Sequence, residues 1–81
     1  MMNKAQKKVL ETKVIEEIYT LALERADAAN DTAEAQQREV QELLEQEADD
    51  WRIESRKNLV EEYKARTEAF KKIAEQLFKL M

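Results

Sequence analysis

Hydrophobic residues recur at steps of three and four along most of the chain, the spacing that places side chains on one side of a helix. The pattern is densest near the C-terminus, where it predicts a helix over residues 51–80. Glu62 stands four residues ahead of Arg66, and such pairs support a solvated surface on the opposite side. We call the apolar side of this helix the C-terminal stripe, and it consists of Leu59, Val60, Tyr63, Phe70, Ile73, Ala74, Leu77, Phe78 and Met81.

Two more helices are predicted upstream, over residues 3–29 and 32–48. The first begins with Asn3 and Gln6, which have the spacing of an N-terminal capping box. Its apolar residues again follow the helical period. The second has fewer apolar residues and several glutamines, so its helix propensity is high while the side available for burial is narrow.

A break between these two helices is predicted at Asn30-Asp31-Thr32. Asparagine tolerates the left-handed conformation that ends many helices when glycine is absent. Asp31 is followed three residues later by Glu34, which is the spacing of a second capping box. We therefore expect one helix to end and another to begin here.

The junction at residues 48–50 allows two interpretations. Either Asp49 or Asp50 caps a helix that starts at Trp51, or the helix runs through, because no glycine marks a turn. Charge favours a turn, since residues 32–54 are strongly acidic and the remaining C-terminal part of the chain is basic. Folding the chain back here sets opposite charges side by side.

A fold-back at Asp49-Asp50 also predicts a register between the helices. It places Asp27 near Lys72 and Glu42 near Lys57. It sets small residues opposite large ones, which lets two helices approach closely. The predicted opposing sets are Ala22, Ala26 and Ala29 against Leu77, Ile73 and Phe70.

The predicted fold is a single all-α domain over residues 1–81. We expect a small antiparallel bundle of three helices, with a helical hairpin or coiled coil that self-associates as the alternative. A chain of 81 residues buries only a thin core, so self-association or a helical partner is expected to complete it.

Composition excludes several kinds of chemistry. The chain has no cysteine and no histidine, which removes disulfides, thiolate and imidazole metal ligands, and catalytic dyads and triads that use either residue. We therefore expect no enzymatic activity, no cofactor, no metal site and no small-molecule substrate. No apolar run approaches the roughly 18 residues that cross a bilayer, and the start leads into an amphipathic segment, so we expect a cytoplasmic protein without membrane contact.

The charged residues bear on two kinds of possible ligand, divalent cations and nucleic acid. Rows of carboxylates in residues 39–54 could bind a divalent cation, but a solvated helix surface is the simpler explanation. Nucleic acid is not an expected partner, because glutamates interleave with the lysines and the net charge is −4.

Trp51 is either a plug beneath the turn, which we favour, or an exposed anchor for a partner.

The function that the sequence favours is protein–protein interaction without catalysis. A small acidic helical adaptor, inhibitor or chaperone-like protein would act through the C-terminal stripe, with a second copy or another helical protein as its partner. The alternative is a purely structural or designed helical bundle or coiled coil without a partner. A carboxylate-rich scaffold for divalent cations is a minor alternative.

Overall fold

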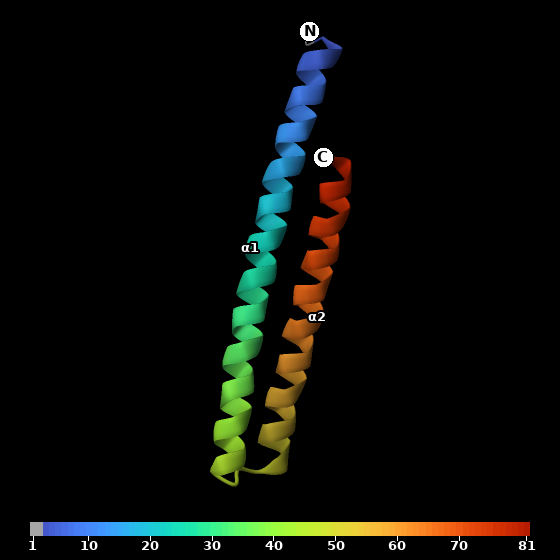
Figure 1. The fold of residues 1–81 in the computed structure, drawn as a ribbon. Coiled ribbons are helices and arrows are strands. Elements are labelled where there is room, and N and C mark those ends of the chain that lie inside the picture. Colours follow the sequence, from blue (N-terminus) through green and yellow to red (C-terminus); the bar gives the residue numbers. More distant parts are fainter. Residues whose placement is uncertain (1–2) are drawn as a thin grey trace.

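The computed structural model describes residues 3–81, which form two antiparallel helices in an extended hairpin (Figure 1). Helix α1 (Lys4–Glu45) and helix α2 (Asp50–Leu80) lie side by side along a molecule 66 Å long. The predicted all-α class is confirmed. The arrangement is the hairpin alternative, and the three-helix bundle is not seen.

Helix α1 begins where the sequence predicts. Asn3 is its N-cap, and the Asn3 side chain accepts a hydrogen bond of 2.8 Å from the backbone N–H of Gln6. The Gln6 side chain accepts one of 3.2 Å from the backbone N–H of Asn3, so the predicted capping box is complete.

The predicted break at Asn30-Asp31-Thr32 is wrong, because α1 continues through it. The local polar side chains are satisfied within the helix. The Thr32 hydroxyl donates to the backbone carbonyl of Ala28, and the Asn30 amide donates to the carboxylate of Glu34. Buried alanines on both sides of the segment pack against α2, and this tertiary packing outweighs the weak stop signal.

The turn between the helices is confirmed, and it is centred on Glu47 and Ala48. The backbone N–H of Ala48 donates to the carbonyl of Leu43, and that of Glu47 donates to the carbonyl of Leu44. These two bonds form a Schellman motif, whose left-handed position is usually glycine. Here Glu47 occupies it, with φ of 53°. Asp49 stands at the N-cap of α2 without a side-chain cap bond.

The core between the helices is built mainly from small residues. Its buried hydrophobic members are Ala22, Ala26, Ala29, Ala33, Val40, Val60 and Ala74. Thr67 is buried with them, and its hydroxyl donates to the backbone carbonyl of Tyr63. Among residues 3–81, no large side chain is fully buried. The helices are therefore close together, but the hairpin hides little large apolar surface.

Helix α1 is longer than α2, so its first turns extend beyond the end of the hairpin (Figure 1). Tyr19 contacts Phe78, two residues before α2 ends at Leu80. Residues 4–16 therefore project past α2, and we call this segment the N-terminal overhang.

Candidate interaction face

The structure divides the predicted C-terminal stripe among three environments. Val60 and Ala74 are buried against α1 and belong to the core. Leu59, Tyr63, Phe70 and Leu77 are partly buried at the edges of the helix contact. Ile73, Phe78 and Met81 remain exposed, with Phe78 at 64 %. The stripe is therefore partly a core surface and only partly available to a partner.

In both helices, the exposed residues that directly precede buried ones lie on the same side of the hairpin. In α1, Leu21 directly precedes the buried Ala22, and in α2, Ile73 directly precedes the buried Ala74. One residue is about 100° of rotation in a helix. Because the two helices are antiparallel, the residue before a core position points to the same side of the hairpin in both of them.

Apolar residues are frequent on this side towards the open end of the hairpin, where Arg25, Glu62, Arg66 and Gln76 lie between them. We call the apolar residues the apolar face, and each except Leu80 directly precedes a buried or partly buried residue along the helix contact. The apolar face consists of Val14, Ile18, Leu21 and Ala28 of α1 and Leu59, Ala69, Ile73 and Leu80 of α2. Of these, only Leu59 is partly buried, and the others are exposed.

The opposite side of the hairpin, formed by residues that follow the core positions, is mostly charged. Lysines and glutamates alternate there along α2, and they form exposed ion pairs such as Lys64 with Glu61 and Lys71 with Glu68. We call it the charged face. Leu23 and Phe78 are exposed there as well, but large exposed apolar residues are more numerous on the apolar face. An exposed apolar surface is typical of a protein that binds another protein.

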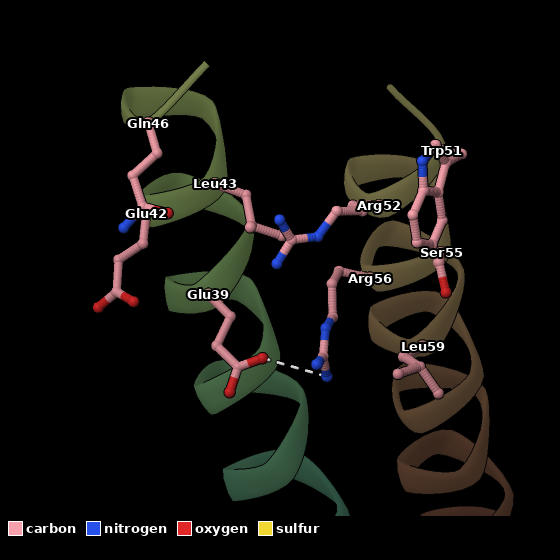
Figure 2. A pocket seen from close by; sticks show the side chains of 9 residues that line it. All are labelled: Glu39, Glu42, Leu43, Gln46, Trp51, Arg52, Ser55, Arg56 and Leu59. Atoms are coloured by element: carbon pink, nitrogen blue, oxygen red, sulfur yellow. Dashed lines mark ion pairs between the residues drawn. The ribbon is translucent and has the colours of Figure 1, made fainter. Parts of the chain in front are cut away.

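Near the turn, the side that bears the apolar face contains a groove of about 660 Å³ (Figure 2). Helix α1 contributes Glu39, Glu42, Leu43 and Gln46, and α2 contributes Trp51, Arg52, Ser55, Arg56 and Leu59. We call it the loop-end groove. Its walls are polar side chains around a few apolar ones.

Arg56 links the two helices inside this groove. Its guanidinium lies 3.1 Å from the carboxylate of Glu39 (Figure 2). It also donates a hydrogen bond of 3.0 Å to the side-chain carbonyl of Gln36. Both charged side chains are more than 40 % exposed, so the pair contributes only about 0.2 to 1 kcal/mol. Its main effect is to fix the register of the helices near the turn. Arg52 reaches from α2 toward α1 in the same groove.

The observed register differs from the predicted one. Folding about Asp49-Asp50 would set Glu39 opposite residue 60, whereas Glu39 pairs with Arg56. The cause is the Schellman motif, which ends α1 at Glu45 and moves the turn towards the N-terminus.

The predicted pair of Glu62 and Arg66 within α2 is confirmed, at 2.6 Å.

Trp51 does not plug the turn, and the interpretation we favoured from the sequence is wrong. Its side chain is 71 % exposed, at the rim of the loop-end groove (Figure 2). The first turn of α2 directs this ring away from α1 because Ile53, two residues later, takes the inward position. The alternative, an exposed anchor for a partner, stays a prediction.

The sequence places the candidate interaction surface on the C-terminal stripe alone. The structure also exposes Val14, Ile18 and Leu21 of α1 on the side that bears the apolar face. The sequence contains one signal for this surface. Larger apolar residues stand directly beside alanines that can pack closely, as Leu21 stands before Ala22.

Neither a metal-binding cluster nor a membrane span is found among residues 3–81. No group of three or more carboxylates is arranged to hold a metal ion. Within the same residues, neither helix has a stretch apolar enough to span a membrane.

No protein-family model matches the chain, and no curated protein or solved structure matches it either. The apolar face and the loop-end groove are therefore the observations from which function is inferred.

Proposed function

We propose that this protein is a non-enzymatic protein–protein interaction module whose apolar face binds another helical surface. The observation that supports this most directly is the exposure of Ile18, Leu21 and Ile73 together on one side of a hairpin whose other side is mostly charged. Isolated apolar residues are common on protein surfaces, but a contiguous one-sided set marks a contact surface.

Energetics supports the same proposal. A hairpin whose core is mostly alanine gains little from burial, and the apolar residues beside that core remain in water. Each large side chain that a partner covers contributes about 1.5 to 3 kcal/mol when fully buried. Binding would therefore stabilise the hairpin while completing the interface, as expected for adaptors, inhibitors and helical chaperones. We expect this activity in the cytoplasm.

A structural role without any regulated partner is the second candidate. Long two-helix rods also serve as spacers, and the 66 Å length would suit that role. The one-sided apolar face favours interaction, because a spacer gains nothing from exposing it.

Site-specific photo-crosslinking tests the proposal. A photoreactive phenylalanine analogue would replace Ile73 on the apolar face or, as a matched control, Lys71 on the charged face. In the cells that produce the protein, we expect a crosslinked protein product from position 73 and much less from position 71. Equal products, or none at position 73, would contradict an interaction through this face.

A further inference from the structure

We infer that the apolar face is covered by a second copy of the chain, in an antiparallel four-helix bundle whose two turns lie at opposite ends. This inference rests on the proposed function and adds the identity and orientation of the partner. Four observations support it: the pattern along α1, the distribution of charge, the N-terminal overhang without a neighbour, and the area of the face.

One line of residues on α1 is complementary to the same line read in the opposite direction. Lys7, Val14, Leu21, Ala28, Ala35 and Glu42 follow one another at intervals of seven, so they lie along one side of the helix. A two-fold axis between Leu21 and Ala28 sets Leu21 against the partner's Ala28 and Val14 against the partner's Ala35. Each large side chain then meets a small one, which allows close packing.

The ends of this line are complementary in charge. The same two-fold axis brings Lys7 of one copy alongside Glu42 of the other, and both residues are exposed in the hairpin. Glu42 is part of the loop-end groove. The groove of each copy would therefore receive the N-terminal overhang of the other.

Net charge at the two ends of the hairpin supports the same orientation. Residues 4–13 of the overhang contain four lysines and one glutamate, while residues 32–54 around the turn contain eight acidic residues and two arginines. An antiparallel pair sets basic ends against acidic ends. A parallel pair would set two acidic ends together, which is unfavourable.

The overhang also needs a surface to pack on. It is the first thirteen residues of α1 and has no neighbour in the hairpin, so no tertiary packing supports this part of the helix. Val9, Leu10 and Val14 are exposed along it, with Val9 at 62 %. A second copy would cover this segment without any other protein.

The area is sufficient for a stable dimer. The hairpin is 66 Å long and 18 Å wide, but the N-terminal overhang is only one helix wide, so two faces in contact bury on the order of 1,500 Å² in total. Stable interfaces bury roughly 1,200 to 2,000 Å² in total.

The first test is the mass of the purified full chain by analytical ultracentrifugation. We expect twice the mass of one chain, falling towards one chain on dilution. Leu21→Asp should weaken the dimer by at least about a hundredfold. Leu23→Asp is the matched control, because Leu23 is also exposed but lies on the charged face, and it should leave the mass unchanged. Circular dichroism would show that both variants keep their helices.

Charge exchange tests the orientation. Lys7→Glu and Glu42→Lys should each weaken the dimer several-fold at low salt, and the doubly exchanged chain should recover. Lys57→Glu, on the charged face, makes the same change in net charge as Lys7→Glu and should have little effect. The same arrangement brings Arg25 of one copy close to Arg25 of the other. Because Arg25→Leu removes this repulsion between like charges, it should tighten the dimer.

The distance between two spin labels, one on each copy of Lys7→Cys, measures the orientation of the dimer independently. In the antiparallel bundle they lie near opposite ends and should be roughly 50 Å apart, given about 1.5 Å per helical residue. A separation below about 25 Å would mean a parallel pair and overturn the orientation. A dimer insensitive to Leu21→Asp would overturn the choice of face.

The two proposals fail in different ways. A chain that is monomeric at all concentrations, yet crosslinks to a different protein at position 73, would overturn self-association and leave the interaction function standing. A monomer with no crosslinked product at position 73 would overturn both.

Discussion

The rings of Tyr19 and Phe78 lie with their centroids 6.1 Å apart and their planes inclined by 40°. This pair joins α1 to the last turns of α2, at the open end of the hairpin. Arg56 and Glu39 join the helices at the other end, next to the turn. The two contacts fix the register from both ends, while the alanines between them set the close spacing of the helices.

Removal of the aromatic contact should loosen the open end. We expect Phe78→Ala to lower the free energy of unfolding by about 1 kcal/mol, because a tilted aromatic pair contributes about 0.5 to 1.5 kcal/mol beyond burial and Phe78 is largely exposed. Chemical denaturation of Phe78→Ala, Tyr19→Ala and the double variant measures the coupling. Strictly additive losses would show that the two rings do not stabilise each other.

The sequence predicts the helices well because their signals are local. The capping box at Asn3 and Gln6 needs only residues three apart, and the apolar period needs only the chain itself. The break at Asn30 was mispredicted because its signals are also local, while the packing that overrides them is not. Ala29 and Ala33 are buried by α2, and no property of residues 30–32 reveals that.

The candidate site depends on features that the sequence leaves open. The stripe around Ile73 and Ala74 is continuous in sequence, and only the position of the turn decides which residue meets α1. Glu47 in the left-handed conformation sets that position, and nothing about glutamate favours it. Once the turn is fixed, Ala74 is buried and Ile73 is exposed.

Asp31 distinguishes a continuous α1 from two helices. In a continuous helix it is an exposed interior residue with low helix propensity, so Asp31→Ala should raise the free energy of unfolding by about 0.5 kcal/mol. If a helix began there, the same change would remove a cap and cost about 0.5 to 2 kcal/mol. Thermal denaturation at one fixed protein concentration gives the sign, and a lower melting temperature would contradict the continuous helix.

Close approach of the helices requires a small residue at position 26. Ala26 is 3 % exposed, so Ala26→Leu should push the helices apart and destabilise the hairpin by about 1 to 3 kcal/mol. Ala65→Leu is the matched control, because Ala65 is exposed on α2 and leucine is nearly as good a helix former as alanine. Equal stability of the two variants in urea would argue against tight packing at Ala26.

The turn contains backbone strain that glycine would relieve. A left-handed conformation costs a residue with a side chain about 1 to 2 kcal/mol, and Glu47 has φ of 53°. Part of the gain from glycine is lost because glycine has more freedom in the unfolded chain, so we expect Glu47→Gly to stabilise the protein by about 0.5 to 1 kcal/mol. Glu45→Gly is the control, because Glu45 is the last residue of α1 and glycine there should destabilise the helix. Urea denaturation of both variants measures the difference, and a loss of stability in Glu47→Gly would mean that residue 47 does not form the left-handed position of the Schellman motif.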